Sequence, residues 1–239
     1  MFTDRKIKVF WNWFVDNVNS YERTDVNFSN MHQSHDDSAT LHLLKQVQKI
    51  DKKLHIAHWL YNEKNTQRQL IISANGNLKK FALVKKIVER APAIKGWEAI
   101  AFRPRIDESD LTMYLNGHHG VSDDEVNLYR NTPFEAGLIM MQMVVQDNNA
   151  MSVDKMYYDI EIVKNKIHIN VYGNGLGKYT TDSVHETGMI FIQYVLGEYN
   201  ALMKVHKFSF YGLDCAHDFS ELKPLTELHK YVETLPDKN

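Results

Sequence analysis

Residues 156–173 read MYYDIEIVKNKIHINVYG, which is two runs of strand-forming residues on either side of the dipeptide Lys164-Asn165. Aromatic and β-branched residues favour extended structure, and a two-residue polar break is enough to join antiparallel strands. Asp159 and Glu161 are two residues apart, so they share one face of the first strand, which we expect to be the solvent face. The stretch therefore predicts a β-hairpin.

The chain after this hairpin predicts a crossover to a third strand. A loop with three glycines is followed by a helix from Asp182 to about Met203 and by the strand HKFSFYG over residues 206–212. One stripe of the helix is apolar or small at spacings of three and four residues, which indicates a buried face. Its members are Val184, Gly188, Phe191, Ile192, Val195, Tyr199 and Leu202.

The same order occurs about a hundred residues earlier in the chain. Two strand-like runs, LHIAHWLYN (54–62) and TQRQLIISA (66–74), precede a helix over 78–91 that Pro92 ends, and WEAIAFRP (97–104) follows as a strand. The inner face of this helix carries Leu78, Phe81, Val84, Ile87, Val88 and Ala91. We infer an α+β fold in which two ββαβ halves form a mainly antiparallel sheet with helices packed on it.

Two helices are predicted before the first half. Over residues 7–18, apolar side chains recur every three or four positions, whereas residues 20–37 are polar and predict a loop. Asp37 or Ser38 can cap a second helix. The expected inward residues are Ile7, Phe10, Trp11, Phe14, Val15 and Val18 in the first helix and Leu41, Leu44, Val47 and Ile50 in the second.

The predicted organisation has three segments that form one compact unit. Residues 1–53 carry the N-terminal helices, residues 54–130 the first ββαβ half with a polar excursion, and residues 131–239 the second half and a C-terminal tail. The second half opens with TPFEAGLIMMQMVVQ (132–146), which we interpret as a buried helix, with a buried strand as the alternative because its apolar residues show no clear period.

Two segments resemble a bacterial protein family with no assigned activity, a domain of unknown function. They are IISANGNLKKFALVKKIVERAPAIKGWEAIAFRPR (71–105) and YVLGEYNALMKVHKFSF (194–210), and the resemblance extends over about residues 66–210. It implies a shared fold and a bacterial source, and it implies no chemistry.

Composition excludes several classes of protein. The 239 residues include 28 basic and 30 acidic side chains, so there is no positive excess to neutralise a nucleic-acid backbone. No apolar run approaches the roughly 20 residues that span a bilayer, and no signal peptide is evident, so we expect no membrane association. The single cysteine, Cys215, cannot form an intramolecular disulfide, which favours a reducing compartment, the cytoplasm.

Two groups of residues are candidates for binding an anion. The loop GNGLGK (173–178) offers Gly175, Gly177 and Lys178 before a helix, yet it lacks the spacing of the known phosphate-binding glycine motifs, so a plain connection is the alternative. Arg103 and Arg105 follow a strand and are able to grip a carboxylate or phosphate, although charged residues at strand ends are often only solvated.

The polar excursion and the first loop carry the remaining candidates. His118, His119 and Asp123 combine acid–base groups with a carboxylate, although acidic residues that begin a helix explain part of this pattern. His32, His35 and Asp36 are of the types that bind metals, but too few ligands are evident to define a site. His55 and His58 lie three apart on a strand, so they face opposite sides, and Cys215 is expected to be an inert thiol.

These patterns favour a non-enzymatic cytoplasmic binding or interaction protein without a cofactor, whose partner is another protein or a second copy of the chain. The alternative is a hydrolase of small molecules or phosphoesters that uses His118 or His119 together with Asp123.

Overall fold

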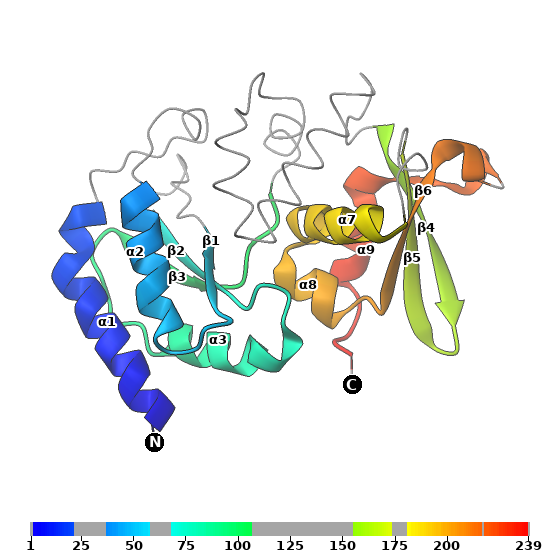
Figure 1. Cartoon of the computed structure of the whole chain (residues 1–239). Coiled ribbons are helices and arrows are strands. Elements are labelled where there is room, and N and C mark those ends of the chain that lie inside the picture. Colours follow the sequence, from blue (N-terminus) through cyan, green and yellow to red (C-terminus); the bar gives the residue numbers. More distant parts are fainter. Residues whose placement is uncertain are drawn as a thin grey trace. The chain divides into compact units, whose positions relative to one another are not determined.

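The computed structural model describes residues 2–21, 37–57, 68–106, 155–173, 181–216 and 218–238 (Figure 1). The chain divides into two compact units, Met1–Arg103 and Pro104–Asn239, here called the N-terminal and C-terminal units. The N-terminal helices belong to the same unit as the first ββαβ half. Most of the predicted loop over 20–37 and the whole of the segment 132–146 lie outside the described residues.

The N-terminal unit begins with α1 (Phe2–Tyr21) and α2 (Asp37–Gln48), so both predicted helices are confirmed. Their inward faces differ from the prediction in detail, because Val15 is exposed and Leu43 is buried where Leu44 was expected. The indole Nε1 of Trp11 donates a hydrogen bond to the Ile87 carbonyl over 2.9 Å. The buried face of the two helices and the segment that follows them carries Ile7, Phe10, Trp11, Phe14, Leu43, Val47 and Ile50.

A three-stranded sheet forms the centre of this unit, in the order β1-β2-β3. β1 (His55–Ala57) pairs antiparallel with β2 (Arg68–Ser73), and β2 pairs parallel with β3 (Trp97–Ala101). The short helix η2 (Leu78–Lys80) and α3 (Phe81–Glu89) connect β2 to β3. Phe81, Val84 and Ile87 are buried as expected, whereas Leu78 is exposed because the tighter turn of η2 breaks the period of α3.

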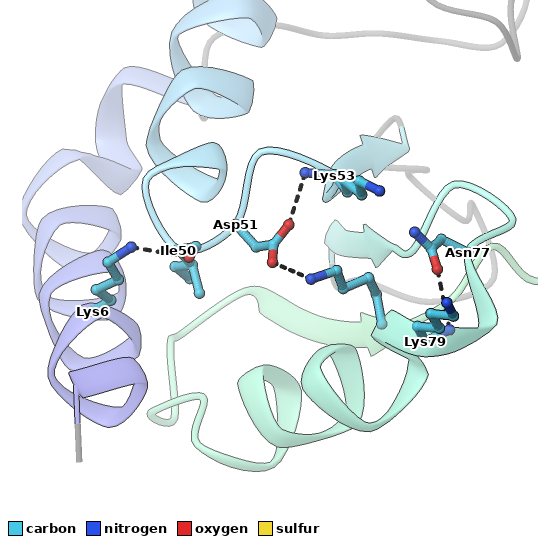
Figure 2. Close-up of polar contacts among 7 residues, drawn as sticks. Lys6, Ile50, Asp51, Lys53, Asn77 and Lys79 are labelled. Atoms are coloured by element: carbon cyan, nitrogen blue, oxygen red, sulfur yellow. Dashed lines mark hydrogen bonds and ion pairs between the residues drawn. The ribbon is translucent and has the colours of Figure 1, made fainter.

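Figure 2 shows polar contacts of α1, of the segment that follows α2 and of η2. Asp51, between α2 and β1, accepts the backbone N–H of Lys53 over 2.9 Å and forms an ion pair with Lys80 of η2. Asn77 caps η2, since its side chain accepts the N–H of Lys79 over 3.1 Å. Lys6 of α1 donates to the Ile50 carbonyl over 3.2 Å. The contacts of Asp51 and Asn77 both hold η2, at the far end of the loop that follows β2.

The C-terminal unit has a second sheet, in the order β6-β5-β4-β7. β4 (Tyr157–Val163) and β5 (Lys166–Gly173) form the predicted hairpin. The φ angles of Lys164 and Asn165 are 50° and 61°, the positive pair that a two-residue turn of this hand requires. β6 (Lys207–Gly212) pairs parallel with β5, and β7 (Lys223–Pro224) pairs antiparallel with β4. The 3-10 turns η5 (Leu213–Cys215), η6 (Phe219–Glu221) and η7 (Leu225–Glu227) precede the last helix, α9 (Leu228–Glu233).

The single helix predicted from Asp182 to Met203 is two helices, α7 (Thr181–Leu196) and α8 (Glu198–Met203). Gly197 separates them with a φ of +81°, a conformation that glycine adopts without steric cost and that ends a helix. α7 lies along one face of the sheet (Figure 1), where Gly188 packs directly on the ring of Phe210 in β6.

The α+β class and the two ββαβ halves are confirmed, with one correction to the sheet. In the described residues each half forms its own sheet instead of contributing to one, and each sheet contains a parallel pair, β2–β3 or β5–β6. The physical reason is that a helix between two paired strands returns the chain to the same end of the sheet, so the strands run parallel.

Candidate functional site

Of the residues that the sequence proposes for anion, metal or acid–base chemistry, only Arg103 and Arg105 are described. The anion candidates Gly175, Gly177 and Lys178 lie outside the described residues, and so do His118, His119 and Asp123 and the metal candidates His32, His35 and Asp36. Those assignments stay predictions.

The two arginines of the FRPR segment have different environments. Arg103 is 4% exposed, whereas Arg105 lies at the surface. The residue before Arg103 explains the burial, because Phe102 adopts a φ of +71°, which interrupts the alternation of side chains along the strand. Phe102 and Arg103 are consequently both buried although they are consecutive.

Arg103 contacts a side chain of β1 and one of the loop after β2, at the end of the sheet where β2 and β3 finish. Its Nη2 atom lies 3.4 Å from Nδ1 of His55 and 3.4 Å from Oδ1 of Asn75. His55 begins β1 and is 8% exposed, and the strand register places it opposite Ser73, the last residue of β2. We refer to Arg103, His55 and Asn75 as the donor cluster.

The loop after β2 positions Asn75. The N–H of Asn75 donates to the Ser73 hydroxyl over 2.9 Å, and Ser73 is completely buried. Asn75 and Gly76 have φ angles of 50° and 76°, which turn the chain sharply between β2 and η2. Asparagine tolerates this left-handed conformation better than most residues, so the Asn-Gly pair suits the turn.

The chemistry of the donor cluster follows from its hydrogen-bonding atoms. A guanidinium has no acceptor atom, so Nδ1 of His55 and Oδ1 of Asn75 face it as acceptors. A histidine that accepts at Nδ1 is a neutral ring with its hydrogen on Nε2. The other polar atoms of the three side chains are then N–H donors, and a group of donors complements a carboxylate or phosphate, which only accepts.

A backbone hydrogen bond and a ring contact hold Phe102, the residue before Arg103, in place. Its N–H donates to the Ile72 carbonyl over 2.9 Å, which extends the β2–β3 pairing by one residue. Its ring packs on that of Phe81 with 4.4 Å between the centroids. A left-handed conformation costs a bulky residue on the order of 1 kcal/mol or more, so the surrounding packing has to hold it in place.

Sequence reasoning identified Arg103 and missed its partners. His55 was compared only with His58, and the hairpin register that places His55 beside Ser73 depends on the connection over residues 58–67. The usable signal was the Asn-Gly pair at the end of a strand, which marks a sharp turn at the carboxyl end of β2.

Two other candidates are weaker. Cys215 is exposed, and its thiol lies 3.9 Å from Oδ1 of Asp214, a carboxylate that is too weak a base to activate it. Within the described part of the chain, no group of three or more His, Cys, Asp or Glu side chains is placed to hold a metal ion.

Comparison with known proteins gives no further constraint on this site. Searches against protein families, curated proteins and solved structures find no match to the chain. None of the described helices is long and apolar enough to cross a membrane.

Proposed function

We propose that the protein binds a small molecule with a carboxylate or phosphate group at the edge of the sheet where Arg103, His55 and Asn75 meet. The observation that carries this proposal is the burial of the Arg103 guanidinium beside the imidazole of His55 and the amide of Asn75, which come from two other elements. A buried guanidinium presents a rigid fork of donors that matches the two oxygens of a carboxylate or phosphate.

The position of the cluster gives independent support. β2 and β3 run parallel, so their carboxyl ends, Ser73 and Ala101, lie at the same edge as the cluster. Ligands of sheets with parallel strands and crossover helices bind at this edge, because the loops there are free to vary while the strands hold them in place.

Backbone conformation at the site is a second support. Phe102 and Asn75 are both non-glycine residues with positive φ, and they flank the cluster on β3 and on the loop after β2. Costly conformations concentrate at ligand sites, where they aim particular side chains. At this edge they direct the side chain of Arg103 and the amide of Asn75 toward one another.

The proposal concerns binding and includes no reaction, in keeping with the preference from sequence for a binding protein. Asn75 and Arg103 lie in the segment 71–105 that carries the resemblance to a bacterial family, whereas His55 lies before it, so we also propose that members of that family share the Arg103–Asn75 part of the site. The single exposed cysteine is consistent with a cytoplasmic location.

Thermal unfolding with added anions tests this function. Inorganic phosphate, acetate and citrate are added to the full chain at constant ionic strength, with chloride as the reference. A ligand at about 100 times its dissociation constant adds roughly 2.7 kcal/mol to the stability. We expect at least one of the three anions to raise the midpoint above the chloride reference.

Three variants separate binding at the cluster from a general effect of salt on stability, since phosphate stabilises many proteins without a site. Arg103→Lys keeps the charge and removes the fork, and Asn75→Gly keeps the positive φ and removes the amide, so both should lose the increase. Arg105→Gln, a surface change two residues from Arg103, is the matched control and should retain it. Equal increases in Arg103→Lys and wild type would contradict the proposal.

A further inference from the structure

The sheet of the C-terminal unit has two faces of different character. The register places Tyr158, Ile169 and Phe208 on one face, which is buried, and α7 covers this side (Figure 1). The opposite face is polar and aromatic, and the short turn η6 reaches it through Phe219. Its members, read from the register, are Tyr157, Asp159, Glu161, Val163, Lys166, His168, Asn170, Tyr172, Lys207, Ser209 and Tyr211.

Four aromatic side chains cross one end of this face. Tyr172 of β5 stacks on Tyr211 of β6 with 5.5 Å between the ring centroids, and Tyr157 is directly opposite Tyr172 in the register. Phe219 of η6 contacts Tyr157 edge-on, with 4.8 Å between the centroids. We refer to Tyr157, Tyr172, Tyr211 and Phe219 as the aromatic row.

The outer members of the row are accessible. Tyr211 is 39% exposed and Phe219 is 52% exposed, while Tyr157 is half-buried and Tyr172 is buried. With neighbouring strands about 4.8 Å apart, the row extends for about 15 Å, the length of four or five extended residues. A row of this length with accessible outer members fits an extended peptide segment better than one small molecule.

Negative charge accompanies the row. The carboxylate of Asp159 accepts the Tyr172 hydroxyl over 2.7 Å and the Asn170 amide over 2.8 Å. Each carboxylate oxygen has two acceptor positions, so these bonds leave capacity for a further donor. Asp218 directly precedes Phe219, and its carboxylate accepts from Ser220. The row therefore combines ring faces with carboxylates.

Positive charge lies at the other end of the same face. His168 and Lys207 are paired in the register four residues from Tyr172 and Tyr211, which is about 13 Å along the strands. Carboxylates lie between the row and these side chains or level with them, because Asp159 is opposite Asn170 and Glu161 is opposite His168.

We propose that the aromatic row is a docking surface for a basic segment of a partner protein, with an Arg or Lys side chain lying on the rings and pairing with Asp159. Cations are attracted to the faces of aromatic rings, and the neighbouring carboxylates complement the same charge. The carboxylates repel a phosphate backbone, which makes a nucleic acid the less suitable occupant.

The test starts from a library of random octapeptides selected on the immobilised full chain. We expect the enriched sequences to contain Arg or Lys, and we expect a synthetic peptide from this set to bind in a fluorescence anisotropy titration. Tyr211→Ala and Phe219→Ala should each weaken that binding by about twofold to fivefold, the effect of one exposed cation–ring contact. Asp159→Asn, which preserves the shape of the carboxylate, should weaken it as well.

Ile162→Ala is the matched control, since Ile162 is 68% exposed on the opposite face of β4. It should leave the affinity unchanged, and far-UV circular dichroism of all variants checks their folding. Three results would each overturn the proposal: no enriched peptide, enriched peptides without basic residues, or equal affinities for Tyr211→Ala, Phe219→Ala and the wild type. The measurement does not depend on the anion site, so the two proposals succeed or fail separately.

Discussion

Replacement of Gly188 by alanine tests how closely α7 packs on the sheet. A Cβ atom built at Gly188 would lie 2.4, 2.5 and 2.6 Å from three ring carbons of Phe210. Carbon atoms in contact are normally about 3.5–4.0 Å apart, so the ring has to move by roughly 1 Å or α7 has to lift from β6.

Two opposing effects set the magnitude. Overpacking of this kind costs about 1–3 kcal/mol, while alanine in place of glycine inside a helix contributes about 1 kcal/mol of stability. We therefore expect Gly188→Ala to destabilise the protein by about 1 kcal/mol. In a Phe210→Ala background the obstructing ring is gone, so the same substitution should instead stabilise by up to about 1 kcal/mol.

Urea unfolding of the four proteins in this double-mutant cycle gives the coupling between the two positions, which we expect to be about 2 kcal/mol. Far-UV circular dichroism is the appropriate signal. All four tryptophans belong to the N-terminal unit, so tryptophan fluorescence would not report on the unfolding of the C-terminal unit, which contains Gly188 and Phe210. The reasoning is refuted if Gly188→Ala stabilises the wild type, or if it has the same effect in both backgrounds.

Three further predictions concern single contacts. Trp11→Phe removes a buried hydrogen bond to the Ile87 carbonyl and should cost about 1–2 kcal/mol in urea unfolding; an unchanged midpoint would contradict this. Gly197→Ala should cost about 1–2 kcal/mol because its φ is +81°, and a neutral result would show that the break between α7 and α8 is not required. The hydrogen bond from Lys86 and the charge of Arg90 hold the pKa of Asp4 below its usual range, so stability from Asp4 is present above about pH 4 and is lost as the pH falls below it. Asp4→Asn should be less stable than wild type in thermal unfolding at pH 7, by a margin that shrinks below pH 4; a constant margin would contradict the ion pairs.

The proposed anion site was predictable in part. Arg103 was selected because it follows a strand, but the same argument selected Arg105, which is exposed. Arg103 is buried and Arg105 is not because Phe102 adopts a left-handed conformation. Glycine and asparagine favour that conformation and phenylalanine does not, so the sequence gives no sign of it. The sequence therefore named the segment without identifying which arginine is buried.

The sequence by itself determined the local elements of this protein. The hairpin at Lys164-Asn165 and the amphipathic helices follow from side-chain alternation, helical spacing and turn chemistry, all of which act over a few residues. Only the tertiary structure decided that the halves form separate sheets and that His55 meets Arg103, 48 positions away. Strand pairing and burial between residues so far apart in the sequence depend on many tertiary contacts acting together. A pattern of a few neighbouring residues does not specify those contacts.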